Sequence, residues 1–159
     1  MDSTSASGRV LRYGVLAANT HAPFSQKQDR GPDYMIRILL AEDDDSLRHY
    51  LTRALQQAGY EVDAVDRGTA ALPLLQSREY DLLVTDIVMP EMDGIELAQR
   101  CAQVSPYTRV MFITGFAAVA LKTGGEAPRG RVLSKPFHLK ELVLEVKRVF
   151  EEEMASATV

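Results

Sequence analysis

The hydrophobic positions of the chain follow two alternating periods from residue 36 onward. Short, nearly continuous apolar runs are typical of strands buried on both faces, and apolar residues three or four apart are typical of amphipathic helices. The first pattern, with a more alternating variant at 61–66, predicts strands over 36–42, 61–66, 80–87, 109–114 and 131–137. The second pattern predicts helices over 45–60, 68–79, 94–104 and 138–153.

The order of these elements predicts the fold class. Parallel strands need long crossover connections, and helices supply the connections while covering both faces of the sheet. We therefore expect an α/β protein with a five-stranded, doubly wound parallel sheet. Pro73 should start or kink the helix that contains it, since proline lacks the backbone N–H. The segment 116–130 begins with a helical pattern, but its second half contains several glycines and a proline, which disfavour a helix. We therefore expect a short helix and a mobile loop from Lys122 to Gly130.

The two ends of the chain differ from the region between them. Residues 1–34 are rich in Ser, Ala, Gly, Pro and Gln without sustained periodicity, and we expect a disordered leader there. Its apolar run "YGVLAA" is too short for a signal peptide, and Met35 could be the true start of the protein. We expect one domain over 35–153 and a disordered tail over 154–159, with no DNA-binding module.

Composition narrows the function. The formal net charge of -4 argues against nucleic acid as a partner, because phosphate backbones call for a clustered basic face. No apolar run approaches the roughly 20 residues of a membrane span. The single cysteine, Cys101, excludes an internal disulfide and a thiolate metal cluster, and fits a reducing cytoplasm. Its helical context indicates a packing residue.

Polar side chains gather at the predicted carboxyl ends of the strands, where open parallel sheets bind their ligands. They are Glu42, Asp43, Asp44 and Asp45 after the first strand, Asp86 after the third, Thr114 and Gly115 after the fourth, and Ser134, Lys135 and Pro136 after the fifth. We expect acids from two neighbouring strands, a hydroxyl and a lysine to meet in one crevice.

Crowded carboxylates need a compensating cation, and hard oxygen ligands suit Mg²⁺. Lys135 adds a point charge and Thr114 a hydroxyl, each able to bind a phosphoryl oxygen. A carboxylate in such a site can attack phosphorus. Asp86 is the best candidate, because it lies on the central strand. Asp44, Asp45 and Asp93 are interpreted instead as residues that begin helices.

The strings "ILLAEDD", "TDIVMPEMDG", "FITG" and "LSKPF" together resemble the CheY-like receiver domain of response regulators, over 35 to about 153. The resemblance implies the flavodoxin-like strand order 2-1-3-4-5 and a Mg²⁺ cofactor. It also implies that Asp43 contacts Mg²⁺ directly, Glu42 through water, and the Val88 backbone carbonyl as a further ligand beside Asp86.

The same resemblance implies roles for the remaining site residues. Asp86 is the phosphoacceptor, Thr114 the switch hydroxyl, and Lys135 the lysine of the site, with a cis peptide bond to Pro136. Val132 stands where the family usually has an aromatic residue, so switching by an aromatic rotamer is not expected. The resemblance further implies that the chain is a phosphoacceptor and not an enzyme, except that it hydrolyses its own aspartyl phosphate.

Within the family, "ILLAEDDDSLR", "MFITGFAAVAL" and "RVLSKPFHLKEL" resemble the CpdR-type regulators of alphaproteobacteria. That resemblance implies a phosphorelay with a histidine kinase or histidine phosphotransfer protein as donor. It also implies control of the cell cycle through ClpXP-dependent proteolysis, in the cytoplasm and through protein–protein contacts.

Other classes of protein fit the chain less well. A haloacid-dehalogenase-type phosphatase also uses an Asp nucleophile after a strand, but its pattern needs Thr or Val where this chain has Leu47. A dinucleotide binder needs a glycine-rich phosphate loop, and the acidic run after the first strand is its electrostatic opposite. A generic phosphate shuttle, or an adaptor that is never phosphorylated, stays open.

Overall fold

The computed structural model describes residues 33–115 and 130–156, with side chains described as far as residue 152. These residues belong almost wholly to one compact unit, Met35–Thr158. Its strands are β1 (Arg37–Ala41), β2 (Glu61–Val65), β3 (Leu82–Asp86), β4 (Arg109–Thr114) and β5 (Arg131–Ser134). Its helices are α2 (Asp45–Gln57), α3 (Gly68–Ser77), α4 (Gly94–Val104) and α6 (Leu139–Ser156).

The five strands form a single parallel sheet in the order β2-β1-β3-β4-β5. The predicted fold class and strand order are therefore confirmed. β3 is the central strand, and all five of its residues are buried. This burial on both faces explains why its sequence is a continuous apolar run rather than an alternating one.

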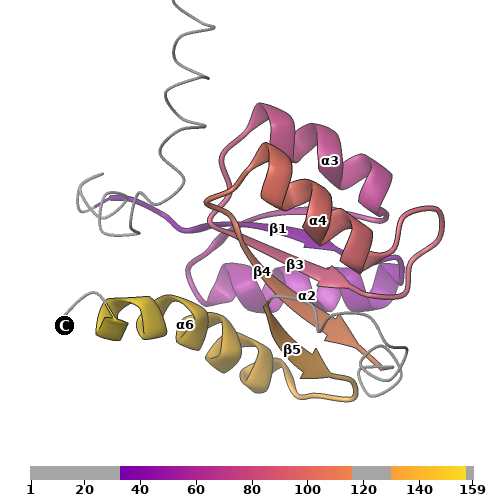
Figure 1. Cartoon of the computed structure of the whole chain (residues 1–159). Coiled ribbons are helices and arrows are strands. Elements are labelled where there is room, and N and C mark those ends of the chain that lie inside the picture. The colour runs from indigo at the N-terminus through magenta and orange to yellow at the C-terminus, as the bar shows by residue number, and fades with distance from the viewer. Residues whose placement is uncertain (1–32, 116–129, 157–159) are drawn as a thin grey trace, which may run out of the picture. The chain divides into compact units, whose positions relative to one another are not determined.

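Helices cover both faces of the sheet: α3 and α4 pack together on one face, and α2 and α6 on the other (Figure 1). Pro73 lies inside α3, so it does not start that helix as one form of the prediction had it. The short helix and mobile loop predicted after β4 lie almost wholly at 116–129, outside the described residues. Val132 is half-buried in β5.

The core on the α3–α4 face joins the strands to the segment that follows β3. Leu39 and Leu83 from the sheet, Leu97 from α4, and Met89 and Met92 from the loop after Asp86 belong to one buried cluster. Met89 and Met92 therefore anchor this loop directly beneath the end of β3.

Cys101 is fully buried in the same cluster, as its helical context indicated. Burial raises the pKa of its thiol to about 12, which keeps the side chain neutral and unreactive.

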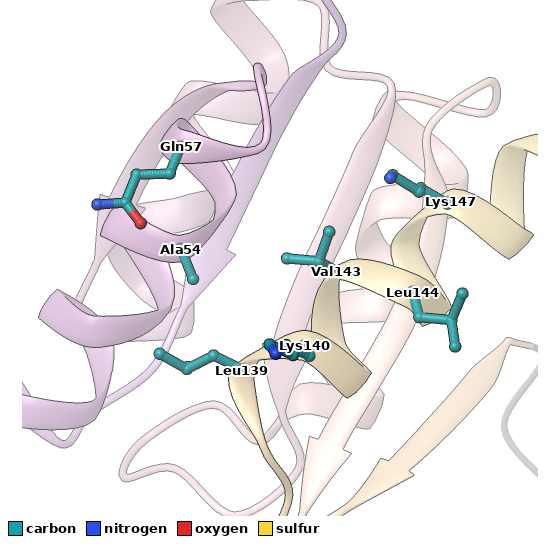
Figure 2. Close-up of a pocket in the computed structure, with 7 residues that line it drawn as sticks. All are labelled: Ala54, Gln57, Leu139, Lys140, Val143, Leu144 and Lys147. Atoms are coloured by element: carbon teal, nitrogen blue, oxygen red, sulfur yellow. The ribbon is translucent and has the colours of Figure 1, made fainter.

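The other face carries an open groove of about 460 Å³ between α2 and α6 (Figure 2). It is lined by Ala54, Gln57, Leu139, Lys140, Val143, Leu144 and Lys147. The groove contains none of the acids at the strand ends, so this groove and the polar cluster are separate features. Within the described segments, no helix is long and apolar enough to cross a membrane.

Candidate functional site

Three carboxylates from two neighbouring strands meet at one end of the sheet. Glu42 and Asp43 directly follow β1, and Asp86 ends β3. The two strands are hydrogen-bonded neighbours, with Ala41 in register with Thr85, so Glu42 follows β1 at the level of Asp86. One oxygen from each of the three carboxylates lies within 4.8 Å of the others. Glu42 and Asp86 are buried, whereas Asp43 is exposed.

Lys135 reaches this cluster from the segment after β5. Its Nζ lies 2.7 Å from Asp86 Oδ2 and 3.2 Å from Glu42 Oε2. Burial acts to lower the pKa of Lys135, but the hydrogen bond to Asp86 and the charges of both carboxylates outweigh it, so the pKa is raised. Lys135 is therefore firmly cationic.

The backbone of Lys135 is attached to the end of β4. The Lys135 N–H donates to the carbonyl of Thr114 at 2.9 Å, which continues the pairing of β4 with β5 beyond Ser134. The Lys135–Pro136 peptide bond is cis, as the resemblance implied.

Glu42 is the most perturbed acid of the site. Burial raises the pKa of its carboxyl, and the charge of Asp86 raises it further. The Asp44 backbone N–H, at 3.2 Å from Glu42 Oε1, and the nearby Lys135 act in the opposite direction. The resulting pKa of Glu42 is about 7, against an ordinary value of 4.5. The three carboxylates outnumber the one ammonium group by two, which favours a further cation.

The two remaining predicted residues lie beside this cluster. Thr114 is the last residue of β4 and is fully buried, one residue beyond Ile113, which pairs with Asp86. The Val88 backbone N–H donates to Asp86 Oδ1 at 3.2 Å, and its side chain is exposed. The Val88 carbonyl as a metal ligand and Thr114 as a switch hydroxyl stay predictions.

The other acids begin helices, as interpreted from the sequence. Asp44 is the N-cap of α2, and its side chain accepts a hydrogen bond from the Leu47 N–H at 2.7 Å. Asp93 is the N-cap of α4 and accepts from the Glu96 N–H at 2.8 Å. Asp45 lies exposed in the first turn of α2. Each satisfies or faces the N–H groups at a helix start.

Gly94 supports the backbone of Asp86 and was not predicted from the sequence to do so. Its N–H donates to the Ile87 carbonyl at 2.8 Å, which folds the loop back under Asp86. A Cβ at this position would overlap the backbone carbonyl oxygen of Asp86, so only glycine permits the approach. The Asp–Gly pair at the start of a helix pattern was the available signal, but it indicates a turn and not what the turn touches.

Comparison with known proteins agrees with this geometry. Residues 38–147 match the response regulator receiver domain family. The chain belongs to the response regulator receiver family. Among its relatives, the response regulator receiver protein CpdR of Brucella abortus is 56% identical over 116 residues, which are 72% of this chain and 97% of that protein.

Two further similarities place the chain among phosphorelay proteins. The sensor kinase CckA of Brucella abortus is 38% identical over 120 residues, 73% of this chain but 13% of the kinase. The structure of the chemotaxis protein CheY4 of Vibrio cholerae superposes with a TM-score of 0.67 at 31% identity, covering 73% of this chain and 99% of that one. The fold and the family are thus those of a two-component signalling domain.

The donor set of the site fits the cation that the family implies. Carboxylate oxygens are hard ligands, and Mg²⁺ in proteins takes one or two of them, with waters and phosphate oxygens completing its octahedron. Asp43 and Asp86 would hold the ion, with Glu42 beside them. Asp43 is exposed, so the site is open to solvent at this acid.

Proposed function

We propose that this protein is a phosphorylation-switched response regulator of a two-component phosphorelay and accepts phosphate at Asp86. The observation that carries the proposal is the contact of Lys135 Nζ with Asp86 Oδ2 at 2.7 Å beside two further carboxylates. An acid on a central strand, with an ammonium group and a cation site beside it, suits attack on phosphorus. The receiver domain spans 35–153 in this proposal.

The chemistry follows from the charges around Asp86. A carboxylate oxygen of Asp86 forms a bond to phosphorus as the bond from phosphorus to a histidine nitrogen of the donor breaks. A Mg²⁺ ion held by Asp43 and Asp86 would stabilise the negative charge on the phosphoryl oxygens. Lys135 moves its ammonium group from the carboxylate to a phosphoryl oxygen, and Thr114 donates to another. The protein's own turnover is limited to hydrolysis of this aspartyl phosphate.

The partners we propose are a histidine kinase or histidine phosphotransfer protein, of the kind that CckA represents, and the ClpXP protease. The similarity to CpdR extends over nearly all of that protein and supports a response regulator of the CpdR type. Control of ClpXP-dependent proteolysis and of the cell cycle is the role that we propose for a regulator of this type. In this proposal the protein works in the cytoplasm through protein contacts, without DNA.

The phosphoacceptor is tested by incubating the purified chain with acetyl phosphate and Mg²⁺ and measuring intact mass. The wild type should gain one phosphoryl group, and Asp86→Asn should gain none. Asp44→Asn is the matched control, because it makes the same change in the acidic run while asparagine keeps the helix cap. A wild type that gains no phosphate, or an Asp86→Asn that still does, contradicts the proposal.

The output is tested with purified ClpXP and a substrate whose degradation needs the regulator. Unphosphorylated wild type and Asp86→Ala should both support degradation, and acetyl phosphate should inhibit only the wild type. If acetyl phosphate changes degradation equally with both proteins, the effect on the protease does not depend on phosphorylation of Asp86, and the proposal is contradicted.

A further inference from the structure

Arg48, in the first turn of α2, contacts the backbone that carries the acidic pair. Its Nη1 donates to the carbonyl oxygen of Glu42 at 2.9 Å, and its Nη2 lies 2.5 Å from Asp45 Oδ1. The side chain is only 22% exposed, so the guanidinium group is held along the protein surface rather than extended into water.

Glu42 is fixed by neighbours on every side, and Arg48 supplies the contact to its carbonyl. The Glu42 N–H donates to Val65 at 3.1 Å, which attaches the residue to β2. Its carboxylate accepts from the Asp44 N–H and from Lys135. The carbonyl belongs to the peptide unit that joins Glu42 to Asp43. Holding that carbonyl therefore fixes the direction in which the chain presents Asp43.

Asp43 is the acid that most needs this support. It is exposed, whereas Glu42 and Asp86 are buried and accept hydrogen bonds from Lys135. A cation that demands a near-ideal octahedron binds well only where its ligands are placed in advance, and ligand-positioning neighbours commonly change metal affinity by tenfold or more.

The charge of Arg48 acts against cation binding, and Asp45 limits this effect. A guanidinium group beside a divalent site repels the ion, but the ion pair with Asp45 offsets its charge. What remains is the geometric effect of the hydrogen bond to the Glu42 carbonyl, which favours binding. The two effects have opposite signs, so a measurement can separate them.

We propose that Arg48 is a positioning residue of the cation site, holding the Glu42–Asp43 peptide so that Asp43 faces Asp86. This inference rests on the proposed function, because it assigns Arg48 to a Mg²⁺ site. Arg48 itself touches neither the cation nor the phosphoryl group.

Titration calorimetry with Mg²⁺ on the full chain tests the proposal, with Arg48→Met, Arg48→Lys and Arg53→Met. Arg53 is an exposed arginine of the same helix and serves as the matched control. Arg48→Met should weaken Mg²⁺ binding roughly tenfold, and Arg48→Lys less, because lysine keeps one donor for the carbonyl. Arg53→Met should bind as the wild type does.

A second readout needs no metal. In metal-free protein, amide hydrogen exchange at Asp43 and Asp44 should be faster in Arg48→Met than in Arg53→Met, while exchange in β3 stays equal. If Arg48→Met does not fold, Arg48→Lys decides by the same two measurements.

The outcomes separate this inference from the function on which it rests. If Arg48→Met binds Mg²⁺ as tightly as the wild type, or more tightly, the positioning role is wrong and Arg48 acts through its charge or not at all. If the wild type itself binds no Mg²⁺, the proposed function is wrong, and this inference is wrong as well because it depends on that function.

Discussion

Lys135 is the residue on which the balance of charge in the site depends. It lies within hydrogen-bonding distance of both buried carboxylates, Asp86 and Glu42. Removing one partner of a buried ion pair leaves the other charge without compensation, which costs more than the pair contributes. A divalent cation held by Asp43 and Asp86 would supply compensation of the same kind.

This argument predicts how Lys135→Met changes stability. In metal-free buffer the free energy of unfolding should fall by about 1–3 kcal/mol, because Asp86 and Glu42 lose their ammonium partner. Saturating Mg²⁺ should recover much of the loss. Urea titrations with EDTA and with Mg²⁺ check this, with Lys147→Met on the exposed side of α6 as control. A loss of equal size in both buffers contradicts the role of charge.

Gly94→Ala tests the loop that packs against the backbone of Asp86, the proposed phosphoacceptor. The added methyl group overlaps the Asp86 carbonyl, so the backbone after β3 must shift. We expect a loss of about 2–4 kcal/mol in unfolding free energy and slower phosphorylation by acetyl phosphate. Gly59→Ala is an instructive contrast: a Cβ there meets no atom within 4 Å, and only its positive φ of 98° disfavours alanine. If Gly94→Ala costs no more than Gly59→Ala, the close approach is not what selects glycine.

The sequence predicts the charged residues of the site better than it predicts the residues that hold their backbone in place. Glu42, Asp43, Asp86 and Lys135 lie at or just after the carboxyl ends of predicted strands, and carboxyl ends of parallel strands share one edge of a sheet. Their convergence therefore needs only the topology. The roles of Gly94 and Arg48 depend on how closely one backbone segment approaches another, which no periodicity encodes.

At the scale of elements, β3 carries the site because it is the most buried strand. Its neighbours β1 and β4 pair with it along its length. The predicted strands are longer than the observed ones at their ends, since 80–87 becomes Leu82–Asp86 and 131–137 becomes Arg131–Ser134. Residue 136 is a proline and donates no ladder hydrogen bond, so the predicted extension of β5 through it was wrong.

Leu83→Ala tests the central place of β3. Leu83 is fully buried, and its truncation should lower the free energy of unfolding by about 2–5 kcal/mol. Leu144→Ala on α6 is the matched control, because Leu144 is 47% exposed and should cost less than about 1 kcal/mol. Urea unfolding of both variants gives the comparison. Similar losses for the two would contradict the position of β3 in the sheet.

At the scale of the whole molecule, protonation of the site is coupled to the free energy of unfolding. Glu42 sits at the end of a core strand, so the proton it holds in the native state affects global unfolding. The unfolded chain releases this proton near its ordinary pKa of 4.5, and the native protein releases it near 7. Between these two values the native state holds the proton more tightly, so protonation favours folding.

The sign of the resulting pH dependence follows from this difference. The stabilisation is fully present below about pH 4.5 and is lost as the pH rises to about 7, so Glu42 makes unfolding easier toward neutral pH. Its contribution across the window has an upper limit of about 3 kcal/mol, at 1.36 kcal/mol for each unit of pKa. Other carboxylates titrate in the same range, so only the difference between wild type and Glu42→Gln isolates the effect.

We therefore predict that the two proteins diverge with pH in EDTA. Between about pH 4.5 and 7 the unfolding free energy of the wild type should fall relative to that of Glu42→Gln, because glutamine carries no titrating proton. Saturating Mg²⁺ should shrink the divergence, since a cation beside Glu42 favours its ionised form and lowers its pKa. Urea titrations at several pH values measure this. Parallel curves for wild type and Glu42→Gln in EDTA would mean that Glu42 titrates in the native protein as it does in the unfolded chain, and that the acids at the strand ends are not crowded enough to need a cation.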